Sequence, residues 1–184
     1  MTPPSKTIAQ QKRSLYVKQF QAFDILKQKN IAVSEDDFDS DVSVSISVDR
    51  TALSPCITAS SSAEFDAAQT RKFPFSYTHN TFDNSPLIAA VASHLGLPEA
   101  SHGNLARLVQ GLWEIFKEKE AFLLETRVGS AADGSLGVHG ARFGFDDAAF
   151  RSSGRQEDIH RLRNTAEEGP EEIEAEKDGI VYVK

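Results

Sequence analysis

The stretch LARLVQGLWEIFKEKEAFLLETRVGSAADGSLGVHGARFGFDDAAF, residues 105–150, decides the fold. Its first part predicts an amphipathic helix, because apolar side chains recur at steps of three and four residues. Its second part predicts a β-hairpin, in which the apolar run 121–128 pairs with 135–143 through the turn residues Asp133 and Gly134. A helix on a two-stranded hairpin is not stable alone, so more sheet is expected. The apolar positions of the helix are Leu105, Leu108, Leu112, Ile115 and Phe116.

Two further strands are predicted upstream of this stretch. Residues 42–48, VSVSISV, alternate strictly between a β-branched residue and serine, which is the pattern of a strand with one polar face. Residues 49–55 predict a turn, and residues 56–60, CITAS, predict the returning strand. Four antiparallel strands that carry helices on one face make an α+β fold.

Helices are predicted around these strands. A three-turn helix is expected to begin at Ser14 and to end near Asn30. A shorter helix begins at Pro86 and is stopped by Gly96. Ser101 is the expected N-cap of the long helix, because a serine hydroxyl can accept a hydrogen bond from the first turn.

The remaining segments are predicted to be acidic or irregular. Residues 35–41 hold five acids in seven residues, which is typical of a solvated linker. A calcium loop is rejected there because no glycine supplies the bend. The hydroxyl- and aromatic-rich segment from residue 61 to Pro86 predicts an irregular crossing. Beyond Phe150 we expect two short acidic helices, the second beginning at Pro170, and a final strand at 179–183.

Composition indicates a globular chain. Of its 184 residues, 40% are apolar and 26% are charged, and no apolar run is long enough to span a membrane. The single cysteine, Cys56, excludes an internal disulfide and is expected to be a small buried side chain rather than a nucleophile. The spacing of His79, His94, His102 and His160 does not suit zinc.

The net charge of −7 is unevenly distributed. The first acid is Asp24, and a basic, hydroxyl-rich start without acids is typical of chains sent to the mitochondrial matrix. A basic terminus with no targeting role fits equally well. RNA, as a candidate partner, would contact this arm, because acids dominate residues 157–178. The basic residues of the arm are Lys6, Lys12, Arg13 and Lys18.

Three stretches together resemble a known family. They are VSVSISVDRTALSPCITAS at 42–60, the stretch at 105–151, and RNTAEEGPEEIEAEKDGIVYV at 163–183, and their order and spacing resemble the ATP-grasp domain of the succinate–CoA ligase β subunit. Residues 13–33 resemble the opening helix of that subunit. The resemblance implies a partial ATP-grasp fold, the carboxy-terminal half of the domain, with an antiparallel sheet and helices on one face.

The resemblance also implies a deletion. Between Val33 and Val42 the family carries the subdomain whose glycine-rich segment and lysine hold the nucleotide, and here an acidic linker replaces it. The expected organisation is a flexible basic arm (1–13), an N-terminal helix (14–33), an acidic linker (34–41) and a degenerate ATP-grasp domain (42–184).

The metal positions of the family are altered as well. In the family, a Glu-x-Asn-Pro motif on the first hairpin strand and an aspartate on the second hold magnesium. Glu125 keeps the glutamate, while Arg127, Val128 and His139 stand at the asparagine, proline and aspartate positions. A cation and an imidazole are poor ligands for Mg²⁺. We therefore expect no metal, no cofactor and no catalytic residue, with Glu125, Arg127 and His139 as vestigial positions.

One alternative keeps a chemical role for two of these residues. His139 and Glu125 could form an acid–base pair across the hairpin. A charge pair between neighbouring strands is the simpler interpretation of the same two residues.

The expected function follows from the resemblance and its departures. It is that of a non-catalytic structural subunit derived from a ligase β chain, bound to protein subunits of a larger assembly in the mitochondrial matrix, such as the mitochondrial ribosome. The alternative is a residual nucleotide-binding or regulatory β-like protein, which still binds nucleotide or pairs with a ligase α chain. The sheet face and edges that the deletion would expose must be covered by the crossing at residues 73–82 itself or by another protein, and the aromatic side chains of that crossing suit this task. The candidate interface residues are Phe73, Phe75, Tyr77, Phe82 and Trp113, of which Trp113, at the edge of the helix stripe, fits the core equally well.

Overall fold

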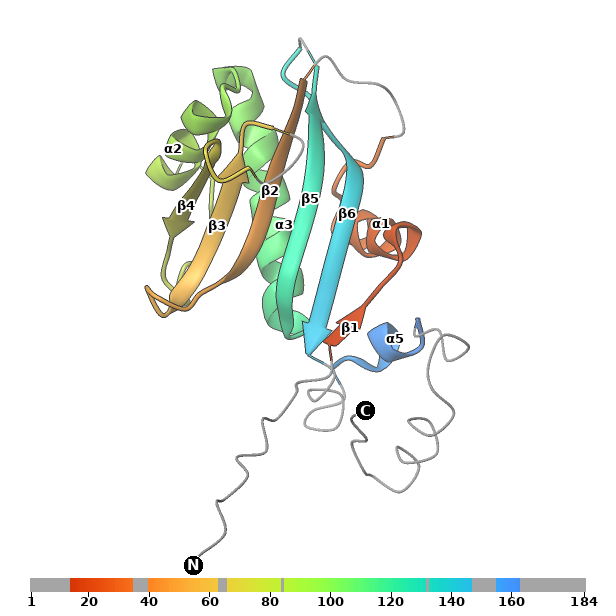
Figure 1. Cartoon of the computed structure of the whole chain (residues 1–184). Coiled ribbons are helices and arrows are strands. Elements are labelled where there is room, and N and C mark those ends of the chain that lie inside the picture. The colour runs from red at the N-terminus through yellow and green to blue at the C-terminus, as the bar shows by residue number, and fades with distance from the viewer. Residues whose placement is uncertain are drawn as a thin grey trace, which may run out of the picture.

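The centre of the molecule is an antiparallel sheet with the strand order β1-β6-β5-β2-β3-β4 (Figure 1). The computed structural model describes residues 14–34, 40–62, 66–83, 85–131, 133–146 and 155–162. Within these residues the strands are β1 (Ser14–Tyr16), β2 (Ser40–Asp49), β3 (Ser54–Ser60), β4 (Thr70–Pro74), β5 (Ala121–Ser130) and β6 (Leu136–Asp146).

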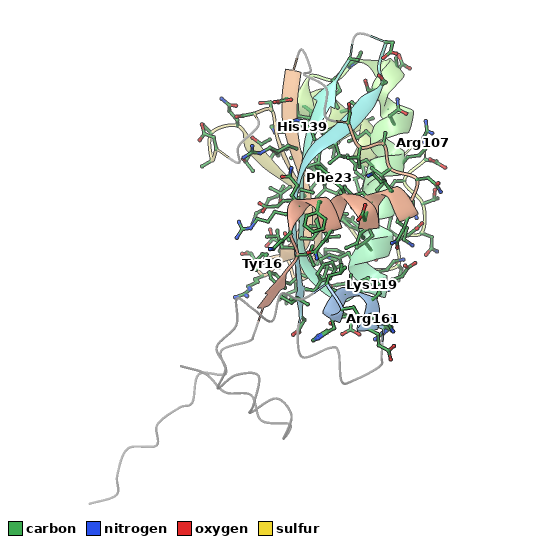
Figure 2. All side chains as sticks on the ribbon, turned by 90° about the vertical axis from the view of Figure 1, so that its right-hand side faces the viewer. Tyr16, Phe23, Arg107, Lys119, His139 and Arg161 are labelled. Carbon is green, nitrogen blue, oxygen red and sulfur yellow. The ribbon has the colours of Figure 1, made fainter. Side chains whose placement is uncertain are left out.

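Helices cover one face of this sheet. In Figure 1, α2 and α3 lie behind the strands, and Figure 2 views the sheet nearly edge-on with α3 on one side. The predicted α+β class, an antiparallel sheet with helices on one face, is confirmed. The helices are α1 (Gln19–Gln28), α2 (Pro86–Leu95), the short 3₁₀ helix η1 (Glu99–Ser101), α3 (His102–Glu118) and α5 (Glu157–His160).

The core lies between the sheet and α3. Val44 pairs with Thr126 and Ile46 with Leu124, and all four side chains are buried on the face that the helices cover. The hydroxyl of Thr126 donates a 2.8 Å hydrogen bond to the Val44 carbonyl, so this polar group carries no penalty for its burial. Trp113 of α3 is fully buried against the same layer.

The amino-terminal helix begins later than predicted. Residues 14–16 form strand β1, which pairs with the edge of β6, so that Leu15 lies opposite Phe145. The helix then starts at Gln19, and the side-chain oxygen of Gln21 accepts a hydrogen bond from the Lys18 amide. Pairing with a sheet edge more than a hundred residues away is a tertiary interaction that periodicity cannot reveal.

Two further sequence predictions were wrong. The crossing after β3 contains strand β4, which pairs along β3 from Thr70 to Pro74, so the sheet has more strands than the four predicted. The Ser101 side chain makes no capping hydrogen bond, because residues 99–101 form the 3₁₀ turn η1 in front of α3. The boundaries of α2, with left-handed Gly96 at its C-cap, agree with the prediction.

Several predictions lie outside the described residues. These are the basic arm 1–13, most of the acidic linker, and the second acidic helix and final strand of the tail. The division of the chain into domains therefore stays a prediction. The first predicted acidic helix after Phe150 corresponds to the four-residue α5.

Candidate functional site

The candidate site is the sheet face that the helices leave uncovered, here called the open face. Its side chains come from the alternate residues of each strand, so Ser43 and Ser45 of β2 lie opposite Arg127 and Glu125 of β5. Ser43 and Ser45 are buried between longer neighbours, while Glu125 is half-buried and Arg127 is exposed. The period of two in both strands thus places the predicted positions Glu125 and Arg127 side by side on one face.

His139 is brought to this face by a β-bulge. Arg127 pairs with Gly140 but Val128 pairs with Val138, so His139 is the extra residue between the two pairs. Its Nε2 atom lies 2.9 Å from Oδ1 of Asp41, which is on β2, the strand beyond β5. Figure 2 labels His139 near the upper end of the sheet.

The expected pairing of His139 with Glu125 is wrong, both as an acid–base pair and as a charge pair. Glu125 lies opposite Arg142, and its carboxylate is 3.7 Å from the Arg142 guanidinium. His139 reaches Asp41 instead, because the β5–β6 register places Arg142, three residues further along β6, opposite Glu125. The sequence analysis missed both partners, Arg142 and Asp41. Arg142 could have been found from the hairpin register, whereas Asp41 needs the β2–β5 pairing.

Arg127 lies flat across the neighbouring strand. A Cβ atom on Gly140 would be 3.1–3.2 Å from the Cβ, Cγ and Cδ atoms of Arg127, so the arginine stem occupies the space that this glycine leaves open. No ion pair of Arg127 occurs within the part of the chain that the structure describes. The Arg127 side chain thus places a positive charge on the open face.

These residues do not fit a magnesium ion. The one carboxylate at a predicted ligand position, Glu125, is already paired with a guanidinium, and a second guanidinium, that of Arg127, stands two residues away on the same face. Mg²⁺ needs several hard oxygen ligands and is repelled by fixed cations. Within the described ranges no three His, Cys, Asp or Glu side chains come together as a metal-binding group.

The other predicted site residues are spread over the fold. Cys56 is a free, buried thiol, as predicted, and its burial raises its pKa. Nε2 of His94 lies 3.0 Å from the Gln69 carbonyl oxygen and 3.2 Å from that of Ala59, so this histidine links α2 to the sheet and to the loop before β4. The backbone carbonyl of His79 accepts a hydrogen bond from the Trp113 indole.

Four of the five candidate interface aromatics are core residues. Phe73, Phe75, Phe82 and Trp113 are all less than 9% exposed, so the interface role expected for the three phenylalanines is wrong, and of the two roles left open for Trp113 the structure shows the core one. Phe75 packs edge-on against Trp113 with ring centroids 5.0 Å apart. Aromatic residues in an irregular segment can fold back onto a helix, and composition alone does not distinguish this from surface exposure. Tyr77 is 54% exposed and keeps its candidate role.

A groove that the sequence analysis did not predict lies between the end of α3 and α5. Its volume is about 770 Å³, and charged side chains of both signs line it. The ammonium of Lys119 is 2.8 Å from the Asp158 carboxylate, and Arg155 pairs with Glu120. These ion pairs link α5 to the end of α3. Because the charges of the groove pair with one another, the groove favours no particular ligand charge. Figure 2 shows Lys119 and Arg161 at this end of the molecule.

Comparisons with known proteins agree with the resemblance. The chain is 29% identical over 148 residues to the mitochondrial β subunit of ADP-forming succinate–CoA ligase from Neurospora crassa, a match that covers 77% of this chain and 32% of that protein. It is 33% identical over 94 residues to the corresponding subunit from Staphylococcus aureus, covering 50% of this chain and 24% of that one. The chain therefore spans about a third or less of the length of these relatives. No protein-family model matches the sequence.

A solved structure shares the fold. ATP citrate lyase from Methanothrix soehngenii, in complex with citrate and coenzyme A, superposes with a TM-score of 0.51 at 11% identity, over 67% of this chain and 28% of that one. At this identity the likeness concerns the fold alone. A search of the described helices found none with the length and apolar character needed to cross a membrane.

Proposed function

Since the chain is similar in sequence to part of the succinate–CoA ligase β subunits and has part of an ATP-grasp fold, we propose that it is a non-catalytic relative of them that serves as a structural subunit of a larger assembly. In this proposal the fold is retained because its surfaces bind other subunits. The chemistry of phosphoryl transfer has been lost from the open face.

The observation that carries the proposal is the set of side chains at the metal positions. Glu125 is neutralised by Arg142, Arg127 adds a further cation, and His139 is held by Asp41. Each of these contacts would have to break before oxygen ligands could surround Mg²⁺, and Arg127 would still repel the ion. The side chains of the open face therefore do not favour a nucleotide bound through magnesium.

The proposed setting is the mitochondrial matrix. One relative is a mitochondrial subunit by name. The mitochondrial ribosome is a proposed host assembly, with protein subunits as the main contacts and RNA as a further contact of the basic arm. Lys18 is exposed in front of α1, as an RNA contact requires.

The alternative is a regulatory protein that still binds nucleotide at Glu125. One calorimetric titration decides between the two, using the full chain with Mg-ADP and with Mg-ATP at millimolar concentration. Thermal melting is measured in parallel, because a ligand present at 100 times its dissociation constant stabilises by about 2.7 kcal/mol. We expect no heat of binding and no shift in melting temperature.

A restored variant supplies the control. Arg127→Asn combined with His139→Asp returns two oxygen ligands beside Glu125, so this variant should gain weak Mn²⁺ binding that the parent chain lacks, detectable by electron paramagnetic resonance. Saturable Mn²⁺ or nucleotide binding by the parent chain would overturn the loss of metal chemistry. The structural role is tested separately, by sizing the native protein from cells. It should travel in a stoichiometric particle rather than as a free chain of 20.2 kDa.

A further inference from the structure

The turn between β2 and β3 holds a leucine, Leu53, in an unfavourable backbone conformation and exposed to solvent. Leu53 has a φ of +50°, in the left-handed region, where a residue with a branched apolar side chain is strained and glycine or asparagine is preferred. Its side chain is also 81% exposed, so no packing within the chain compensates for the strain. A residue that is unfavourable in both backbone and solvation indicates a contact outside the chain.

The turn is held in place rather than loose. Oδ1 of Asp49 accepts hydrogen bonds from the Thr51 and Ala52 amides at 2.8 and 3.1 Å, and its other oxygen lies 3.1 Å from the ammonium of Lys72 on β4. These contacts, the Ala52 hydrogen bond first, lower the pKa of Asp49, in keeping with a carboxylate that holds the turn in its charged form. Leu53 is therefore presented on a preorganised support, which lowers the entropy cost of binding.

Two more exposed apolar side chains lie at the same end of the molecule. Val48, 41% exposed, pairs with Pro55, whose carbonyl accepts a hydrogen bond from the Phe75 amide. Tyr77 follows two residues later, with its ring 5.9 Å from the Trp113 ring. Tyr77 therefore borders the Trp113 ring of α3, and Val48 lies opposite Pro55, which is hydrogen-bonded to the segment that leads to Tyr77. In Figure 1 this end is the lower left, where the β2–β3 turn projects.

Two basic side chains, Lys117 and Arg50, lie near these residues, and Lys117 also lies close to Glu114 of α3. The ammonium of Lys117 lies 5.1 Å from the centre of the Trp113 ring, and Arg50 is exposed in the turn beside Leu53. The nearest acid in the turn, Asp49, is engaged by Lys72. An apolar surface with a basic rim is complementary to apolar side chains flanked by carboxylates.

We propose that Val48, Leu53 and Tyr77, here called the hairpin surface, form the docking site for another protein, which binds through a segment of apolar side chains flanked by acids. The inference rests on the proposed structural role and names the surface that role uses. The strain at Leu53 persists because the leucine is buried in the bound state. In the isolated chain, where no partner buries Leu53, the turn would be more stable with a residue suited to positive φ at this position.

The test compares the stability of the isolated chain with its assembly. Leu53→Asn removes both the strain and the apolar side chain, so the isolated variant should melt roughly 2–4 °C higher than the parent. In cells that also express the untagged parent, the tagged variant should be depleted from the native particle about tenfold or more. Ala52→Asn places the same side chain one residue earlier in the turn and should assemble normally.

Photo-crosslinking identifies the occupant. A benzophenone amino acid at position 53 should give one adduct, with a protein segment of the particle that contains apolar and acidic residues. An adduct with RNA or with a second copy of this chain would overturn the proposal, and so would the absence of any adduct.

The outcomes also separate this inference from the structural role. If the parent chain assembles and Leu53→Asn assembles equally well, the hairpin surface is not the docking site, although the structural role stands. If Leu53→Asn is depleted but melts lower than the parent, depletion reflects misfolding and the inference fails. If the parent chain itself travels alone, the structural role and its docking site are both refuted.

Discussion

The hairpin that carries Glu125 and His139 is anchored at its turn by Gly134, and replacing this glycine should destabilise the protein. Gly134 has a φ of +82° and is buried against η1. A Cβ atom there would lie 2.7 Å from the Cβ and 2.9 Å from the backbone carbon of Ala100. The carbonyl of Gly134 also accepts a 2.9 Å hydrogen bond from the Asn104 side chain, which fixes the turn against α3.

Two costs add in Gly134→Ala. Left-handed backbone costs an alanine about 1 kcal/mol relative to glycine. Overpacking against a backbone atom, which cannot rotate away, adds about 1–3 kcal/mol. The expected loss is therefore about 2–4 kcal/mol, or a melting temperature lower by about 5–15 °C for a chain of this size.

Urea denaturation measures this loss, with fluorescence of the single tryptophan, the buried Trp113, as the probe. Gly103→Ala is the matched control, since Gly103 lies in α3 with open space around it and no left-handed φ. That change should stabilise by up to about 1 kcal/mol, because alanine favours helix. If Gly134→Ala lies within about 0.5 kcal/mol of the parent, the range of ordinary surface substitutions, the assigned geometry of the turn is wrong.

Two further results are expected from contacts that hold the layers together. Lys29→Met should cost about 1 kcal/mol or less in low salt and almost nothing in high salt, since the ammonium joins the end of α1 to Glu114 and Glu118 of α3 at partly exposed positions. The Glu114 carboxyl has its pKa lowered by the Gln110 amide and by Lys29, so its stabilisation is present above the usual glutamate pKa of 4.5 and is lost as pH falls through the lower folded value. A pH series of urea melts should therefore show a smaller loss of stability below pH 4.5 in Lys29→Met than in the parent. A thiol reagent should modify Cys56 far more slowly in the native protein than in urea, because burial raises the pKa of this thiol, and equal rates would show that the strand is open to solvent.

Much of the fold could be predicted from local patterns. The alternation in residues 42–48 predicted β2, the three- and four-residue steps predicted α3, and Pro86 with Gly96 bounded α2, as the structure confirms. In these elements one face is buried, so the period of the side chains records the backbone geometry. Strand β4 could not be predicted in this way, since it is short, lies at the sheet edge and exposes Arg71 and Lys72.

In the candidate site, too, local pattern predicted some features and tertiary structure decided the others. The sequence placed Glu125 and Arg127 on one face of a strand, because residues two apart in a strand share a face. The partners of these side chains were decided by the tertiary structure, through the register of β5 with β6 and the bulge at His139. A bulge depends on how two strands meet, and a one-residue shift changes every cross-strand neighbour.

The sequence alone therefore determined the class of the fold and its family resemblance, and through that resemblance it predicted that Arg127 and His139 stand where the family has magnesium ligands. Only the tertiary structure decided that the aromatic segment is core, that Arg142 and Asp41 engage the altered positions, and that Leu53 is strained and exposed. The physical reason is the separation along the chain over which each interaction acts. Periodicity and turn chemistry act over a few residues and are written in the sequence, whereas burial and charge pairing depend on strands that lie far apart along the chain.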